Sequence, residues 1–422
     1  MYKQFSSFKP TLLFFTPEYK ELADVVARNS AGLIELGHLR LDKNGKWPEF
    51  KDGWSNLFIQ NQYNIKDRDV VFLTSLDTPK KVFVELAVMY ALPQYRGRNY
   101  KVIVPWFPTG TMERVSRYGE IATAHTMAAL LGATPMCATG PSCVCVIDIH
   151  ALQEQFYFGN HVQVELKTAM GLLFSENVIK PWDIVVFPDD GASKRYKYLF
   201  KDVIFKRQRE EWLKTPRGVI VAGEWRAWLT NNETSDQKRR GILSVQGKTL
   251  VTRNDNLNDE LKVLESDYRE WCTQKQVDMY DNARMVVCAK QRVGDKRIIV
   301  INEGVQNIQD GANCIIVDDM VQSGSTIIEC AKELHRHGDL TVNAFCTHGV
   351  FPGESWRKFE KQIVNTFYVT NSLPRNNDNY FEHEHPQEST VFKVLSVEPI
   401  VSLLCLDTKR TRNKDIAELY ES

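Results

Sequence analysis

Short runs of β-branched and other apolar residues alternate along the chain with longer stretches of helical periodicity. The strand-like runs include DVVFLTS (69–75), YKVIVPWF (100–107), CVCVIDIH (143–150), DIVVFPD (183–189) and NCIIVDD (313–319). Strands that alternate with helices in this way indicate parallel sheets built from right-handed βαβ units. At 422 residues the chain is too long for one ordinary core, so we expect two α/β domains.

Polar motifs follow several of these runs at the point where the strand ends. PTGTMER comes after the run at 100–107, and DDMVQSGST comes after NCIIV. Ligands of open parallel sheets bind beyond the carboxyl ends of the strands. The pattern therefore predicts a ligand site at these ends.

Composition narrows the class of protein. The apolar fraction is 43%, and 53 basic side chains balance 53 acidic ones. This balance argues against a nucleic-acid partner held by bulk charge. The nine cysteines form no CxxC pair, which suits a reducing compartment. No run approaches the ~18 apolar residues of a membrane span, and the first ten residues lack a signal core. We expect a cytoplasmic protein with no membrane partner.

The segment NCIIVDDMVQSGST (313–326) has the residues of a phosphate cradle. Its strand ends on Asp318 and Asp319, and the loop residues that open the next helix are Gln322, Ser323, Gly324, Ser325 and Thr326. Small and hydroxyl residues at a helix N-terminus favour an anion, and the preceding carboxylates can accept hydrogen bonds from sugar hydroxyls. An ordinary capped helix is the alternative, but two acids before such a loop favour the ligand site.

Val317–Thr326 resembles the phosphoribosyl-diphosphate loop of type I phosphoribosyltransferases and of phosphoribosyl-diphosphate synthases. From residue 11 to about 205, and from 285 to about 403, the chain is similar to the synthases, above all to the plant-type class II enzymes. The shared motifs are FPTGTMERV, IHALQE, FYFG, FPDDGA, RVGDKR and THG.

This resemblance implies an α/β fold of two tandem type I phosphoribosyltransferase-like domains, each a mainly parallel sheet flanked by helices. The expected domains are residues 1–165 on the ATP side and 166–405 on the ribose 5-phosphate side, followed by a tail at 406–422. The second domain carries a flap hairpin and a Trp-rich insertion at 207–284, which is interpreted as a surface excursion or a contact for regulation or assembly. The implied enzyme is a ribose-phosphate diphosphokinase that uses Mg²⁺, acts on ATP and ribose 5-phosphate, and forms a homo-oligomer.

The resemblance also assigns residues to the ATP. The loop after the run at 100–107 provides Thr111, Met112, Glu113 and Arg114, and an N-terminal turn provides Phe50, Asp52, Gly53 and Trp54. Arg114 can reach phosphates as a bidentate donor, whereas Met112 offers only packing.

Metal and diphosphate residues are implied in two further loops. His150, with Asp148 two residues before it, and Asp189 match metal-associated positions of the family. Because Mg²⁺ prefers oxygen and keeps several waters, we expect His150 to act from the outer shell. The cradle for the diphosphate is expected at Asp190, Gly191 and Ala192.

Lys290 and Arg292 are the candidate catalytic pair. Residues two apart on a strand point the same way, so both can converge on one bound ATP. Cations that close over a phosphoryl transition state contribute on the order of 10³–10⁵ in rate, and the resemblance implies an essential Lys and Arg here on a mobile flap. The alternative is a salt-bridged exposed strand.

Two other functions stay open at this level. A phosphoribosyltransferase would account for Val317–Thr326 but not for FPTGTMER and IHALQE. A non-catalytic regulatory relative is the other possibility, and the retained Lys290 and Arg292 argue against it. Cys143 and Cys145 point to one face of a buried strand, for which we expect core packing, and His383-Glu384-His385 is interpreted as a solvated loop.

Overall fold

A computed structural model describes residues 9–180, 183–200, 285–293, 296–376, 381 and 391–406, without the side chains of 292–297. The predicted insertion at 207–284, the tail beyond residue 406 and His383-Glu384-His385 lie outside these residues.

The first sheet is wholly parallel, with the strand order β2-β1-β3-β4-β5-β6. Its strands are β1 (Thr11–Phe15), β2 (Ile34–Leu36), β3 (Val70–Leu73), β4 (Tyr100–Val104), β5 (Cys143–Ile147) and β6 (Gln163–Lys167). Helix α1 (Lys20–Asn29) packs on one face, and α2 (Pro79–Ala91) and α3 (Thr123–Gly132) pack on the other. The side chains of β1 and β3 alternate between these two cores, as expected for strands covered on both faces.

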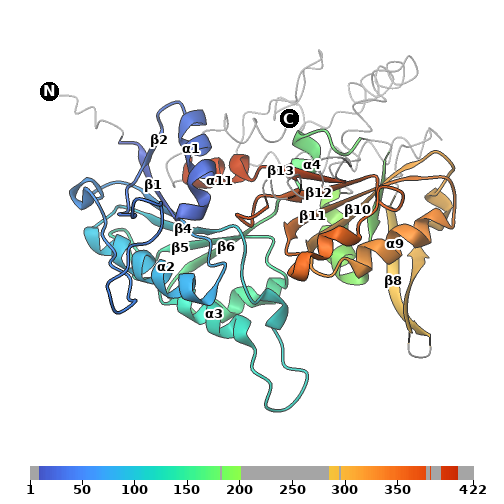
Figure 1. Cartoon of the computed structure of the whole chain (residues 1–422), viewed down its shortest axis with the longest axis horizontal. Coiled ribbons are helices and arrows are strands. Elements are labelled where there is room, and N and C mark those ends of the chain that lie inside the picture. Colours follow the sequence, from blue (N-terminus) through green and yellow to red (C-terminus); the bar gives the residue numbers. More distant parts are fainter. Residues whose placement is uncertain are drawn as a thin grey trace, which may run out of the picture.

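The second sheet has the order β13-β12-β11-β10-β7-β8-β9 and is parallel except for the β8–β9 hairpin. Its strands are β7 (Ile184–Phe187), β8 (Met285–Val293), β9 (Lys296–Glu303), β10 (Asn313–Val321), β11 (Thr341–Gly349), β12 (Thr366–Thr370) and β13 (Phe392–Leu395). Helix α9 (Ser325–His335) packs beside β10, and the β8–β9 hairpin extends away from the sheet (Figure 1). The predicted α/β fold with a hairpin is confirmed.

The remaining elements are short. Helix α4 (Leu172–Ser175) follows the first sheet, and α11 (Glu398–Leu406) follows the second. Among the described residues, 3₁₀ segments cover Pro17–Tyr19, Gln62–Asn64, Leu92–Tyr95, Gly110–Met112, Leu152–Phe158, Val305–Asn307 and Pro352–Lys358, the last with a kink at Gly353 and Glu354.

One hydrophobic core joins the two sheets. It contains Leu13 and Ile103 from the first sheet and Val185 and Phe345 from the second. Helix α11 contributes to the same core and lies against α1 and β1 (Figure 1). The predicted division near residue 165 stays a prediction, but α11 follows the second sheet in sequence and packs on the first.

Buried hydrogen bonds hold the carboxyl ends of the sheets together. The carboxylate of Asp148, just after β5, accepts from the Thr347 hydroxyl of β11 at 2.6 Å. His348 of β11 lies 3.1 Å from the carbonyl oxygen of Ile147 through Nε2, and the Tyr19 hydroxyl donates to the carbonyl of Ser372. These contacts set the strand ends of the two sheets against each other.

Candidate active site

A cavity of about 900 Å³ lies at the carboxyl ends of strands from both sheets. Most of the residues predicted for the site line it: Thr111, Glu113, Arg114, His150, Asp189, Asp190, Gly191, Ala192, Lys290, Asp318, Asp319, Gln322, Ser323, Gly324 and Thr326. Residues far apart in the sequence therefore share one space, at the position expected for a ligand of parallel sheets.

The loop between β10 and α9 forms one wall of the cavity. The Ser355 hydroxyl donates to the carbonyl of Gln322 at 2.5 Å, and the hydroxyls of Ser323 and Ser325 lie 3.0 Å apart. Ser323 is exposed at the opening of the 11-residue helix α9. Helix N-termini carry N–H groups without intrahelical partners and a partial positive charge, so the loop is suited to a phosphate.

Gly324 determines the shape of this loop. Its φ of +78° lies in the left-handed region, and a Cβ here would come within 2.6 Å of the Phe359 ring. Both the backbone conformation and the space therefore require glycine.

Gly324→Ala should destabilise the protein more than the same substitution at an unobstructed glycine. Gly311→Ala is the matched control, because Gly311 has the same φ of +78° and a Cβ added there would meet nothing within 4 Å. The left-handed conformation costs each variant about 1–2 kcal/mol, and the clash adds about 1–3 kcal/mol to Gly324→Ala alone. Urea unfolding midpoints measure the difference; equal midpoints for the two variants would contradict it.

His150 and Asp319 meet across the cavity. His150 follows β5 of the first sheet, and its Nδ1 lies 2.7 Å from Oδ2 of Asp319 on β10 of the second. The hydrogen bond with Asp319 raises the pKa of His150 above its usual value. Burial alone would raise the pKa of Asp319, but His150, together with Asp318 and Arg195, outweighs burial and holds it below its usual value. The pair favours a charged imidazolium–carboxylate contact.

Arg195 is a site residue that the sequence interpretation missed. Its guanidinium donates to the carbonyls of Ile149 and His150, the latter at 3.1 Å, and lies 4.0 Å from Asp319. The side chain is only 13% exposed, so it orients the His150 loop from within. The sequence signal that could have identified Arg195 was its position in FPDDGASKR, where helical residues follow Asp189.

Lys290 of β8 contacts Asp189, so a predicted catalytic residue pairs with a predicted metal residue. The Lys290 Nζ lies 2.6 Å from Oδ2 of Asp189, and Oδ1 accepts the Ala192 N–H at 3.1 Å. Burial would raise the pKa of Asp189, yet Lys290 and the backbone N–H groups hold it below its usual value. The backbone of Arg292 pairs with that of Arg297 in the hairpin, while the Arg292 side chain lies outside the described residues.

The loop after β4 contributes another basic group, Arg114. The Arg114 side chain is 80% exposed and its Nε lies 2.8 Å from Oε1 of the buried Glu113. The Tyr157 hydroxyl donates to the Glu113 carbonyl at 2.8 Å, which secures the loop. Met112 does not line the cavity, so its predicted packing on a nucleotide stays a prediction.

Other predicted residues lie away from the cavity lining. Asp148 is fully buried, and its oxygens already accept from Thr347, from the Ala169 N–H at 2.8 Å and from the Tyr196 hydroxyl at 3.0 Å. Asp148 therefore links the two sheets through these hydrogen bonds, and its predicted association with a metal stays a prediction. Ser325 also stands outside the lining, next to Thr326.

The N-terminal turn predicted to contact ATP is exposed and flanked by the Glu49–Ser55 bridge. Trp54 is 61% exposed and packs edge-on against Phe83 at 5.4 Å between ring centroids. With its neighbours Phe50, Asp52 and Gly53, it does not line the cavity within this chain.

Glu154 is a buried carboxyl beside the cavity that the sequence interpretation did not assign. Oε1 accepts the Ala151 N–H at 2.9 Å, which fixes the turn after His150. Oε2 is buried without a hydrogen-bond partner. Burial raises the pKa of Glu154 to about 7.

The free energy of unfolding of Glu154→Gln, relative to that of the wild type, should increase as the pH rises. The unfolded glutamic acid ionises near pH 4.3 and the folded one near 7, so the wild type loses stability as pH rises between these values. Glutamine keeps the acceptor for Ala151 and cannot ionise. The thermal midpoint of the variant minus that of wild type should increase by about 2–4 °C between about pH 5 and pH 8. A difference that is constant with pH would contradict this prediction.

The carboxylates of Asp189, Asp318 and Asp319 suit a magnesium ion, which prefers oxygen ligands. Burial and the charges of Asp319 and Asp189 raise the pKa of Asp318 well above its usual value, and a divalent cation would relieve that repulsion. Among the described residues these groups do not form a closed set of three within 4.8 Å. Such an open arrangement fits Mg²⁺, which is usually held by one or two carboxylates together with phosphates and water.

Comparisons with known proteins identify the relatives of this chain. Residues 276–395 match the family model of the phosphoribosyl synthetase-associated domain. The chain is 32% identical to ribose-phosphate pyrophosphokinase 3, mitochondrial, of Spinacia oleracea over 87% of this chain and 70% of that protein. It is also 32% identical to ribose-phosphate pyrophosphokinase 4 of Arabidopsis thaliana, over 87% of this chain and 85% of that protein.

A solved structure shares the fold. The phosphoribosylpyrophosphate synthetase of Mycobacterium smegmatis superposes with a TM-score of 0.57 at 18% identity, covering 94% of this chain and 98% of that one. No helix in the described part of the chain has the length and apolar character needed to cross a bilayer. The chain belongs to the ribose-phosphate pyrophosphokinase family and is an enzyme of that type.

Proposed function

We propose that the enzyme transfers the β,γ-diphosphate of ATP to O1 of ribose 5-phosphate, giving 5-phosphoribosyl 1-diphosphate and AMP. The observation that supports this most is the shared cavity, which is lined by Lys290 and Asp189 and by the loop that contains Ser323 and Gly324. A phosphate cradle alone would serve any phosphoribosyl ligand. A cationic side chain in the same cavity suits a reaction in which a diphosphoryl group moves.

Each wall of the cavity has a role in this proposal. The loop before α9 binds the 5-phosphate through its N–H groups and hydroxyls, and the carboxylates of Asp318 and Asp319 accept hydrogen bonds from the sugar hydroxyls. Arg114 contacts the nucleotide phosphates. These contacts hold O1 of the sugar in line with the β-phosphorus, so positioning supplies much of the rate.

Lys290 neutralises charge during the transfer. It pairs with Asp189 at 2.6 Å, and its four-carbon stem lets the ammonium turn from that carboxylate toward an incoming diphosphate. The bond from the β-phosphorus to the α-phosphate oxygen breaks as the bond to O1 forms; AMP leaves, and the proton of the O1 hydroxyl is released to solvent. Mg²⁺ is the proposed cofactor: held by Asp189, Asp318 or Asp319, with His150 nearby, it would supply Lewis-acid stabilisation of the phosphate charge.

The direct test incubates the full chain with ATP, Mg²⁺ and ribose 5-phosphate and measures AMP and phosphoribosyl diphosphate. Equal amounts of the two products are expected, and no AMP without the sugar. Consumption of phosphoribosyl diphosphate with a nucleobase, and no AMP formation, would instead indicate a phosphoribosyltransferase. Omitting inorganic phosphate tests the phosphate independence that the class II resemblance implies.

We also propose a homo-oligomer in the cytoplasm. The oligomer is implied by the resemblance, and light scattering of the purified chain measures it. The spinach relative is named as mitochondrial, so the compartment stays a prediction that a fluorescent fusion of the full chain can check.

A further inference from the structure

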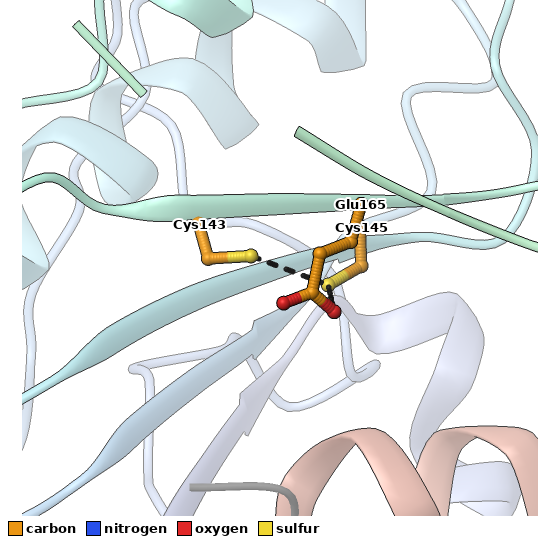
Figure 2. Close-up of side chains that lie close together, drawn as sticks. All are labelled: Cys143, Cys145 and Glu165. Carbon is orange, nitrogen blue, oxygen red and sulfur yellow. Dashed lines mark hydrogen bonds between the residues drawn. The ribbon is translucent and has the colours of Figure 1, made fainter. Parts of the chain in front are cut away.

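Two cysteines and a glutamate come together outside the candidate active site. Cys143 and Cys145 lie two residues apart on β5, and Glu165 is the register partner of Cys145 on β6. Figure 2 shows the Glu165 carboxylate beside the Cys145 sulfur, with both sulfurs on the same side of β5. Among the described residues this is the only group of three or more His, Cys, Asp or Glu whose ligand atoms all lie within 4.8 Å of one another.

The separations match those of a tetrahedral metal centre. With metal–sulfur bonds of about 2.3 Å and metal–oxygen bonds of about 2.1 Å, tetrahedral angles require about 3.8 Å between sulfurs and about 3.6 Å between sulfur and oxygen. The two sulfurs lie 3.6 Å apart, and the Cys145 sulfur lies 3.6 Å from Oε2 of Glu165. The third separation, between the Cys143 sulfur and the Glu165 carboxylate, is within 4.8 Å. Closing it to about 3.6 Å would complete the geometry, with water as the fourth ligand.

Surrounding charge also suits a bound cation. Two thiolates, one carboxylate and a divalent ion have a net charge of −1. Lys167 and Lys101 lie 3.5 and 3.9 Å from Oε2 of Glu165 and can balance that charge. Thiolate ligands select soft cations such as Zn²⁺ over Mg²⁺, so this position would not compete for the cofactor of the active site.

Of Cys143, Cys145 and Glu165, the glutamate is the most exposed to solvent. The two cysteines are 8% and 0% exposed, whereas the side chain of Glu165 is 34% exposed. A cation can therefore approach along the carboxylate before it reaches the sulfurs. Core packing explains why the thiols are buried, and the two lysines pair with the carboxylate; a bound cation would use the carboxylate and both sulfurs together.

We infer that Cys143, Cys145 and Glu165 bind one thiophilic divalent cation of the Zn²⁺ class. Binding replaces one proton on each thiol, and both protons leave to solvent without any change in oxidation state. The cation joins β5 to β6. Beyond this point β5 leads to His150, and the Asp148 N–H donates to the carbonyl of Lys167 on β6 at 2.9 Å, so the cation would brace the strands that carry the His150 loop.

The test uses the full chain, stripped with a chelator and titrated with Cd²⁺ in the absence of nucleotide. Thiolate-to-cadmium charge-transfer absorption should saturate at one equivalent, and the thermal midpoint should rise. The double variant Cys143→Ser, Cys145→Ser should lose the absorption. Glu165→Gln should keep it but weaken binding by at least about tenfold, since even partners outside the first shell change metal affinity by 10–100-fold.

Cys288→Ala is the matched control. Cys288 and Cys330 form a second close thiol pair, with 3.5 Å between sulfurs, but no third ligand completes it among the described residues. The control should bind Cd²⁺ as the wild type does. No thiolate absorption in the wild type, or absorption that persists in the double variant, would overturn the inference. Should the serine variants not fold, as judged by circular dichroism, unchanged affinity in Glu165→Gln overturns it as well.

Discussion

Lys290→Ala should lower the rate of AMP formation by about 10³-fold or more and leave the fold intact. Cations that neutralise a phosphoryl transition state contribute on the order of 10³–10⁵ in rate. The side chain is 44% exposed in its pair with Asp189, so its removal costs little stability. Single-turnover measurement of AMP, with saturating ATP and ribose 5-phosphate, checks the prediction.

Lys197→Ala is the matched control for this variant. Lys197 also forms a 2.7 Å ion pair with a carboxylate, Glu303, and its side chain is likewise 44% exposed. It does not line the cavity, so its loss should leave the rate within about twofold, as for other exposed ion pairs. Near-normal AMP release by Lys290→Ala would remove Lys290 from the catalytic role.

Asp319→Asn should lower kcat/KM by about 10²-fold. The carboxylate makes a 2.7 Å contact with His150 and lies 4.0 Å from Arg195. A charge-assisted hydrogen bond is worth about 1.5–3 kcal/mol, and the upper value corresponds to about 10²-fold. The variant also loses an acceptor for the sugar, so KM for ribose 5-phosphate should rise while KM for ATP changes little. Steady-state kinetics with each substrate varied in turn separate the two effects.

Asp24→Asn is the control for the same substitution. Asp24 pairs with Lys20 at 2.8 Å on the exposed face of α1, outside the cavity lining. Its kinetics should match those of wild type. A fall confined to kcat in Asp319→Asn, with KM for the sugar unchanged, would place Asp319 away from the sugar.

Much of the candidate site could be predicted because its residues follow strands. Asp318, Asp319 and the loop through Thr326 are contiguous, and their local pattern of strand, polar loop and helix is repeated in the structure. The same holds for His150 after β5 and Asp189 after β7. In a parallel sheet, residues after the strands share one edge. Local periodicity was therefore enough to place each of these groups at the carboxyl edge of its own sheet.

Other residues could not be placed from local pattern. Asp148 lies two residues before His150, yet its carboxylate accepts a hydrogen bond from Thr347 of the other sheet. Arg195 looks like one more charge on a helix, but it is buried against the carbonyls of the His150 loop. Cys143 and Cys145 pack in the shared core as expected, whereas the nearness of Glu165 depends on the register of β5 with β6.

The sequence by itself determined the α/β class, the strands and helices of the cradle, and the identity of most residues in the cavity. The class and the cradle follow from periodicity and from neighbours within a few residues, whereas residues such as His150 and Asp189 were implied by the resemblance to the synthases. Only the tertiary structure decided which strand ends face each other, because that arrangement follows from the core shared by the two sheets. The contacts of His150 with Asp319 and of Lys290 with Asp189 span 169 and 101 residues. Such groups are brought together by the packing of the whole chain and not by local propensity.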